Sequence, residues 1–162
     1  MLDPDLYLHS VHDIDLEALL ASGVDTLLMD LDNTLLPRDS GDVPDDLREW
    51  SGRLAQLGFK VCLVSNNWHE RVHEVAQSLG FSLVAKAVKP LPFAFLRALR
   101  LVGSSRVQAA VVCDQMFTDV LGGKLLGIKT ILVTPLSASD LPHTLLLRRA
   151  ERMLLAGRKP KP

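Results

Sequence analysis

The feature that most constrains the fold is a regular alternation of short apolar runs with longer segments of helical periodicity. Near-continuous apolar and β-branched runs are typical of parallel strands that are buried on both faces of a sheet. Five such runs occur, at 24–29, 60–64, 81–85, 107–113 and 130–133. The other segments repeat apolar residues at helical spacing, at 44–57, 68–79, 92–101, 117–126 and 141–156. This alternation predicts an α/β fold with a mainly parallel five-stranded sheet and helices on both faces.

Composition and charge narrow the class of protein further. The chain has 162 residues, of which 48% are apolar and 23% charged, and we expect one domain at 1–156 with a disordered basic tail at 157–162. A formal net charge of −1 argues against a nucleic-acid binder. No apolar run approaches the roughly 20 residues of a membrane-spanning helix. The acidic N-terminus does not resemble a secretory signal, and Cys62 and Cys113 lie in apolar runs, so we expect a cytoplasmic protein with two core thiols.

A pair of carboxylates follows the first predicted strand, at the edge where open parallel sheets bind their ligands. Because successive strand side chains alternate, Asp30 and Asp32 lean to the same side. Two carboxylates this close repel each other unless a cation lies between them or one holds a proton. Mg²⁺ prefers such hard oxygen ligands. The same residue types also form surface turns, so the pair alone leaves both interpretations open.

The next three predicted strands are also followed by polar residues. Ser65 and Asn66 precede a predicted helix, where free amides attract anions, although such residues also cap helices routinely. Lys89 follows the third strand and either neutralises phosphate or is simply solvated. Asp114 and Asp119 follow the fourth, and an acidic residue also matches the charge of a helix start. Taken together, two carboxylate pairs, a serine and a lysine are the parts of a phosphoryl-transfer site.

These residues lie in segments that resemble motifs I to IV of the haloacid-dehalogenase (HAD) superfamily of phosphohydrolases. The stretches LDNTLLPRD, VSNNWHERV, KAVKPLPFAF and CDQMFTDVLGGKLLGIKTILV resemble the class IIIA phosphatases of the YqeG type. That group is similar to the mitochondrial phosphatidylglycerophosphatases. The resemblance covers the chain except its tail, and it implies a three-layer, Rossmann-like HAD fold. One departure is Cys113, because the family usually has glycine at this position. The larger cysteine side chain crowds the metal site slightly without removing a ligand.

The resemblance also implies a reaction and the residues that perform it. The expected activity is Mg²⁺-dependent hydrolysis of phosphomonoesters through an aspartyl-phosphate. Asp30 resembles the nucleophile and Asp32 the general acid and base. The expected Mg²⁺ ligands are Asp30, the backbone carbonyl of Asp32, and Asp114, with Asp119 close by. The residues expected to bind phosphate are Thr34, Ser65, Asn66 and Lys89.

The spacing of the motifs bears on the substrate. A short loop joins Asp32 to Pro44, and one helix and one strand separate Ser65 from Lys89, so neither gap holds a cap domain. We therefore expect an open site, which suits a large, macromolecular or interfacial phosphate ester better than a free metabolite. The resemblance implies phosphatidylglycerophosphate as the substrate. Soluble nucleotide or sugar phosphates are the alternative substrates, and the oligomeric state is left open.

A basic helix near the C-terminus suggests a partner. The predicted helix gathers Arg148, Arg149 and Arg152 opposite apolar residues. Such a face either rests on anionic lipid, placing the protein peripherally on the inner face of the membrane, or is the solvated side of a packing helix.

Two other functions, those of a zinc protease and of a receiver-type signalling module, fit the sequence poorly. The segment HERVH at 69–73 matches the zinc-protease pattern, but no His, Asp or Glu that would complete a zinc site follows Glu74 until Asp114. A second Asp-x-Asp, at Asp13 and Asp15, follows no buried strand and predicts a turn or helix cap. A receiver-type signalling module would carry its acceptor aspartate after a middle strand, where lysines stand here. A catalytically idle HAD-like binding module remains an alternative function.

Overall fold

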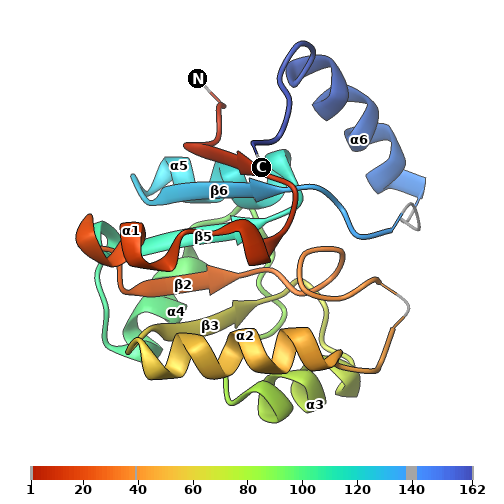
Figure 1. Ribbon diagram of the computed structural model, residues 1–162. Coiled ribbons are helices and arrows are strands. Elements are labelled where there is room, and N and C mark those ends of the chain that lie inside the picture. The colour runs from red at the N-terminus through yellow and green to blue at the C-terminus, as the bar shows by residue number, and fades with distance from the viewer. Residues whose placement is uncertain (1, 39, 138–141, 162) are drawn as a thin grey trace.

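The computed structural model describes residues 2–38, 40–137 and 142–161, and these contain a six-stranded sheet in the order β1-β6-β5-β2-β3-β4 (Figure 1). Every neighbouring pair is parallel. The predicted α/β class is confirmed, and the sheet has six strands instead of five. The strands are β1 (Leu6–Leu8), β2 (Thr26–Met29), β3 (Lys60–Val64), β4 (Ser82–Val84), β5 (Ala109–Cys113) and β6 (Lys129–Val133).

The strand that was not predicted is β1, at the edge of the sheet. It has three residues, pairs with β6 from Leu6 opposite Ile131 to Leu8 opposite Val133, and buries only Leu8. A strand with so few buried positions produces no periodic signal in the sequence. The expected count of five strands is therefore one too low.

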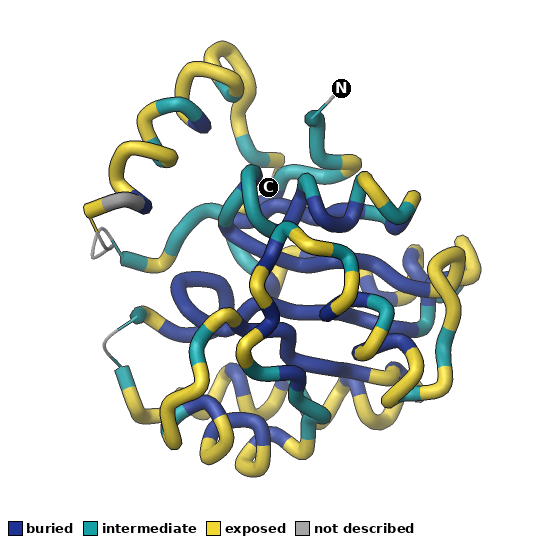
Figure 2. Tube along the Cα trace, turned by 180° about the vertical axis from the view of Figure 1, so that it is seen from behind, coloured by how far each residue is buried: buried dark blue, intermediate teal, exposed yellow. Residues whose placement is uncertain are grey.

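Helices cover both faces of the sheet, and buried backbone runs through its middle (Figures 1 and 2). Leu27 and Met29 of β2 belong to one apolar cluster, with helices α1, α2 and α3, whereas Leu28 belongs to the other, with α4 and the π-helical turn η3. Both faces of β2 are thus buried, which explains its unbroken apolar run. The helices are α1 (Leu16–Ala21), α2 (Asp45–Gln56), α3 (Glu70–Leu79), α4 (Phe93–Val102), η3 (Met116–Val120), α5 (Leu121–Leu125) and α6 (Pro142–Leu154).

A glycine in α5 allows this helix to approach the sheet closely. A Cβ atom at Gly123 would lie 2.8 Å from Cγ2 of Thr130 and 3.2 Å from Cγ2 of Val111. We therefore expect Gly123→Ala to lower the free energy of unfolding by about 1–3 kcal/mol, because overpacking forces the backbone to shift. Urea denaturation measures this loss.

The matched control is Gly52→Ala in α2, where a Cβ would meet open space. Because alanine favours the helix, this change should raise the free energy of unfolding by up to about 1 kcal/mol. Equal stabilities for the two variants would contradict the close approach at Gly123.

The second Asp-x-Asp is a pair of helix caps, as predicted. Asp15 is the N-cap of α1, and its Oδ1 accepts a hydrogen bond from the Ala18 amide at 2.9 Å. Asp13 completes a capping box with Ser10 one turn earlier. Both carboxylates therefore satisfy backbone donors at helix starts.

The sequence predicts a disordered tail at 157–162, and the structure describes contacts for its residues 157–161. The Lys161 amide donates to the Tyr7 carbonyl at 2.8 Å, and Arg158 pairs with Asp3 at 2.9 Å. The unpaired backbone of an edge strand such as β1 is a ready partner for an extended segment. In the described part of the chain, no helix is both long and apolar enough to span a membrane.

Candidate active site

The order of the strands places a ligand site beside β2. Strands β3 and β4 lie on one side of β2, and β5 and β6 lie on the other. Open parallel sheets bind ligands at such a switch point, beyond the carboxyl ends of the strands. Asp30 directly follows β2, Ser65 follows β3 and Asp114 follows β5, while Lys89 lies in the loop between β4 and α4.

A cavity of about 400 Å³ lies at this edge of the sheet. Thr34 and Asp114 do not line it. The buried Thr34 hydroxyl donates to Oδ1 of the buried Asp114 at 3.1 Å. In this structure the Thr34 hydroxyl therefore contacts a carboxylate, and its contact with phosphate stays a prediction. The other six predicted residues do line the cavity: Asp30, Asp32, Ser65, Asn66, Lys89 and Asp119.

Lys89 connects two of the carboxylates. Its Nζ lies 2.9 Å from Oδ1 of Asp30 and 2.7 Å from Oδ1 of Asp119, and its side chain is only 3% exposed. Burial by itself disfavours the ammonium, but the charges of Asp119 and Asp30 outweigh it and raise the pKa of Lys89 above its ordinary value. The interpretation of Lys89 as a solvated surface lysine is thereby excluded.

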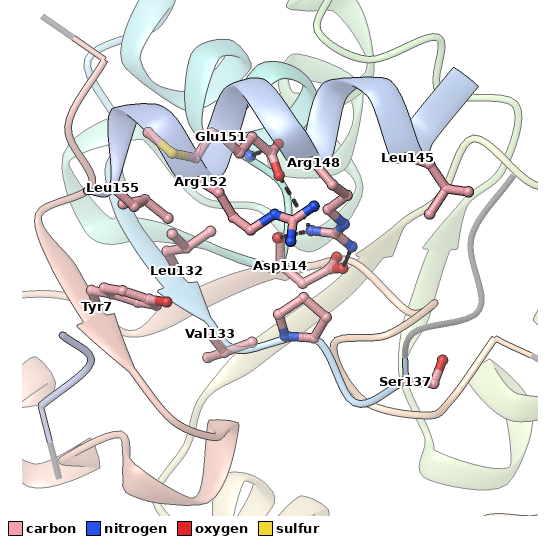
Figure 3. Close-up of a pocket in the computed structure, with 12 residues that line it drawn as sticks. Tyr7, Asp114, Leu132, Val133, Ser137, Leu145, Arg148, Glu151, Arg152 and Leu155 are labelled. Carbon is pink, nitrogen blue, oxygen red and sulfur yellow. Dashed lines mark hydrogen bonds and ion pairs between the residues drawn. The ribbon is translucent and has the colours of Figure 1, made fainter. Parts of the chain in front are cut away.

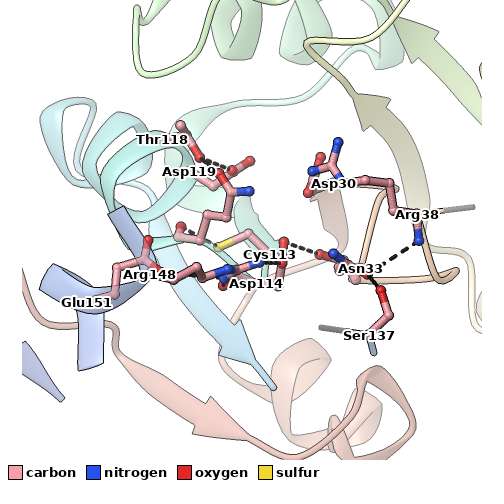
Figure 4. A network of polar contacts seen from close by, with 12 residues as sticks. Asp30, Asn33, Arg38, Cys113, Asp114, Thr118, Asp119, Ser137, Arg148 and Glu151 are labelled. Atoms are coloured by element: carbon pink, nitrogen blue, oxygen red, sulfur yellow. Dashed lines mark hydrogen bonds and ion pairs between the residues drawn. The ribbon is translucent and has the colours of Figure 1, made fainter. Parts of the chain in front are cut away.

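The site brings three carboxylates close to one another in a buried setting. Asp30, Asp114 and Asp119 are all buried, and Figure 4 shows them with their polar contacts. Burial, followed by the charge of Asp30, raises the pKa of Asp114 to about 8, although Arg148 opposes the shift. Burial also raises the pKa of Asp119 to about 6, against the lowering effect of Lys89.

The oxygen atoms of these carboxylates are the ligands that a divalent cation takes. Asp30 and Asp114 present the hard oxygen atoms that Mg²⁺ prefers, and a bound cation would favour their ionised forms. Asp119 is engaged by Lys89 and by the Thr118 hydroxyl at 2.7 Å. Among the described residues, no three His, Cys, Asp or Glu side chains are grouped closely enough to hold a metal alone. A cation would therefore also need backbone carbonyl or water oxygen atoms, and Mg²⁺ usually keeps several waters.

Ser65 and Asn66 begin the loop after β3. The N-cap of α3 is His69, so Ser65 does not cap this helix. The Ser65 hydroxyl accepts a hydrogen bond from the Asn67 amide at 3.1 Å, and Oδ1 of Asn66 accepts one from the Lys89 amide at 2.8 Å. The Asn66 contact joins the loops that follow β3 and β4, and both side chains lie on the cavity wall.

Arg71 of α3, to which the sequence assigned no role, pairs with the predicted general acid. Its Nη1 lies 2.8 Å from Oδ1 of Asp32. The same guanidinium donates to the Pro37 carbonyl at 3.1 Å and to the Ser40 carbonyl. Arg71 therefore ties both Asp32 and the loop after β2 to α3. Because 39 residues separate Arg71 from Asp32, no local pattern signals this contact.

The sequence left open whether Arg148, Arg149 and Arg152 face anionic lipid or form the solvated side of a packing helix, and in the structure Arg148 does neither. Its Nη2 pairs with Oδ2 of Asp114, and its side chain is 12% exposed, while Arg149 and Arg152 are exposed. An unpaired buried carboxylate is costly, so Asp114 draws the nearby guanidinium inward.

Cys113, at the position of the usual family glycine, is a buried free thiol, as is Cys62. Burial and the charges of Asp119 and Asp114 raise the pKa of Cys113 well above its ordinary value. Its Sγ contacts the Gln115 carbonyl at 3.6 Å. Both thiols are thus protonated core residues, as predicted.

The parallel sheet and the acidic, serine and lysine positions at its strand ends define a HAD-like hydrolase, and the family model described as HAD-hydrolase-like matches residues 87–137. The "Probable phosphatase YqeG" of Bacillus subtilis (strain 168) is 38% identical over 158 residues, which are 98% of this chain and 92% of that protein. The chain therefore belongs to the YqeG-type family of HAD phosphatases.

Solved structures share the fold at lower sequence identity. A hydrolase from Streptococcus pneumoniae TIGR4 superposes with a TM-score of 0.56 at 15% identity, covering 80% of this chain and 98% of that one. The cobalt-bound deoxy-D-mannose-octulosonate 8-phosphate phosphatase of Haemophilus influenzae gives 0.51 at 12% identity, covering 83% and 88%. These likenesses show the fold alone.

Proposed function

We propose that this chain hydrolyses phosphomonoesters with Mg²⁺ through an aspartyl-phosphate on Asp30. The observation that carries the proposal is the buried bridge from Lys89 to Asp30 and Asp119, at a cavity that Asp32 and Ser65 also line. An ammonium held beside the nucleophile offsets the charge of a phosphoryl group as it is transferred.

Two carboxylates perform the proton and phosphoryl transfers. The Asp30 carboxylate attacks phosphorus, and the departing alkoxide takes a proton from Asp32. Water then gives a proton to Asp32 and attacks the phosphorus of the aspartyl-phosphate. This second step releases inorganic phosphate and restores both carboxyl groups to their starting forms.

The remaining residues bind and orient the phosphoryl group. The Ser65 hydroxyl, the Asn66 amide and Lys89 hold its oxygen atoms, and one such preorganised donor is worth about 3–4 kcal/mol of the activation barrier. Asp30, the Asp32 carbonyl and Asp114 would hold Mg²⁺, with Asp119 nearby. The bound ion would neutralise charge on the phosphoryl oxygen atoms.

The proposed substrate is a lipid-linked phosphate ester, with phosphatidylglycerophosphate as the first candidate. The described residues between β2 and α4 form loops, α2, β3, α3 and β4, so no cap domain encloses the cavity. Trp68, which is 58% exposed, and Leu147 bring apolar surface to its rim. An open, partly apolar mouth suits a headgroup presented by a lipid surface better than a free metabolite.

Helix α6 supports a peripheral contact with anionic membrane on the cytoplasmic side. Its exposed residues combine cationic Arg149 and Arg152 with apolar Leu146 and Met153, which are 70% and 79% exposed. The protein should float with anionic liposomes at low salt and be released at high salt. Failure to bind at low salt would remove this part of the proposal.

A phosphate-release screen tests the function. Phosphatidylglycerophosphate in mixed micelles is compared with nucleotide and sugar phosphates, with Mg²⁺ or with a chelator. We expect Mg²⁺-dependent release that is fastest from the lipid. Release from soluble esters alone would overturn the substrate assignment, and no release from any ester would favour a catalytically idle binding module.

Arg71 provides a test of the role of Asp32. We expect Arg71→Ala to slow hydrolysis of alkyl phosphates about 10- to 100-fold, because a misplaced general acid protonates a poor leaving group inefficiently. Hydrolysis of p-nitrophenyl phosphate, whose leaving group needs little protonation, should fall much less. The control is Arg48→Ala, which removes an exposed contact to Ser78 of α3. Equal losses on both ester classes would contradict a role through Asp32.

A further inference from the structure

Helix α6 directs two charged side chains onto the segment that follows β5 (Figure 3). Arg148 pairs through Nη2 with Oδ2 of Asp114 and donates through Nη1 to the Asp114 backbone carbonyl at 2.5 Å. Oε1 of Glu151 accepts hydrogen bonds from the Met116 amide at 2.7 Å and the Phe117 amide at 3.4 Å. The two side chains also contact each other at 3.4 Å. We call Arg148 and Glu151 the α6 clamp.

The α6 clamp controls the position of both later carboxylates. Arg148 and the Thr34 hydroxyl engage different oxygen atoms of Asp114, so the rotation of this carboxylate is fixed from two sides. Glu151 satisfies amides at the first turn of η3, the element that carries Asp119 to Lys89. A buried acceptor at a helix start fixes the direction of that helix.

Tight packing of α6 does not account for the clamp. A cavity of about 330 Å³ lies beside the clamp, lined mainly by apolar side chains that include Tyr7 of β1, Leu132 of β6 and Leu155 beyond α6. A buried ion pair is also weak evidence for stability, because apolar residues of similar volume often stabilise as well or better. The clamp side chains are only 12% and 7% exposed. The removal of these two charged side chains from water is better explained by the groups that they hold in place, which are the Asp114 carboxylate and the first turn of η3.

We propose that Arg148 and Glu151 are positioning residues for cation binding at Asp114, an inference that rests on the proposed function. Ligating carboxylates are usually oriented by hydrogen bonds from outside the metal site, and loss of such a partner typically weakens metal binding about 10- to 100-fold. Helix α6, far along the chain from the other site residues, is then part of the active site.

Binding of Mn²⁺ to the whole protein, followed by the loss of its free-ion electron paramagnetic resonance signal, tests the inference without turnover. We expect Arg148→Gln to weaken Mn²⁺ binding about 10- to 100-fold. The neighbouring exposed Arg149→Gln is the matched control and should bind like the wild type. Glu151→Ala should weaken binding in the same direction as Arg148→Gln.

Arg148→Lys keeps the charge but loses the forked geometry, so it should show an intermediate affinity. If Arg148→Gln does not fold, the Mn²⁺ affinity of Arg148→Lys tests the positioning role in its place. Wild-type affinity in a folded Arg148 variant, or tighter binding, would overturn the positioning role, since tighter binding would mean that Arg148 competes with the cation. A wild-type protein that binds no Mn²⁺ would overturn the metal part of the proposed function as well.

Discussion

Asp30→Asn is expected to abolish phosphate release, with a loss of at least about four orders of magnitude, since removal of a nucleophile costs about 10⁶-fold in a well-studied covalent enzyme. An amide does not form the acyl-phosphate on which the second step depends. Asparagine keeps the shape of the side chain and an oxygen that accepts from Lys89, whose Nζ lies 2.9 Å from Oδ1 of Asp30. The protein should therefore stay folded. The measurement is phosphate release under conditions in which the wild type is active.

The control is Asp13→Asn, the same chemical change in another Asp-x-Asp of the chain, at Asp13 and Asp15. Asp13 accepts a hydrogen bond from the Ser10 amide in an exposed capping box, far in sequence from the strand ends. This variant should keep its activity. Full activity in Asp30→Asn would show that the nucleophile is misassigned, whatever the reaction proves to be.

Lys89→Met is expected to lower the free energy of unfolding by about 3–5 kcal/mol, because it leaves Asp30 and Asp119 buried without their shared cation. The methionine side chain is unbranched like that of lysine and only one atom shorter, so the loss comes mainly from charge and not from a void. Urea denaturation in the presence of a chelator measures it. Added Mg²⁺ should recover part of the loss, since a cation bound to the folded state stabilises it.

Two further variants separate charge from packing. The exposed Lys86→Met, in the same loop, should change the free energy of unfolding by no more than about 0.5 kcal/mol. The double variant Lys89→Met/Asp119→Asn should be more stable than Lys89→Met, because one uncompensated carboxylate becomes a neutral amide. If the double variant were the less stable of the two, the buried bridge would not be the source of the effect.

Much of the site could be predicted because of how parallel sheets are built. The runs that became β2, β3 and β5 are apolar at every buried position except Thr26, and the first polar residue after each run marks the end of the strand. Parallel strands end at one edge, so Asp30, Ser65 and Asp114 had to approach one another. The position of Lys89 near this edge could be predicted for the same reason, because it lies in the loop after β4. Its double contact with Asp30 and Asp119 could not be predicted in this way.

The contacts that sequence reasoning missed are non-local and depend on side-chain direction. Thr34 lies in the first motif yet bonds Asp114, 80 residues away. Arg148 belongs to a helix whose amphipathic pattern indicates only which residues are polar. Whether such a residue meets solvent or a buried carboxylate depends on where the helix docks. Strand β1 was missed for a different reason, because a three-residue edge strand has too little pattern to detect.

By itself, the amino-acid sequence determined the α/β class and the chemical groups at the edge of the sheet that forms the active site, because periodic burial and strand ends are local properties of a chain. It also determined the helices and strands other than β1, α1 and the two 3-10 turns, at Val11–Asp13 and Arg106–Gln108. Only the tertiary structure decided how the charges pair: Lys89 between two aspartates, Arg71 on Asp32, and Arg148 on Asp114. An ion pair forms where two side chains meet within a few ångströms away from water, and that meeting is a property of the folded chain.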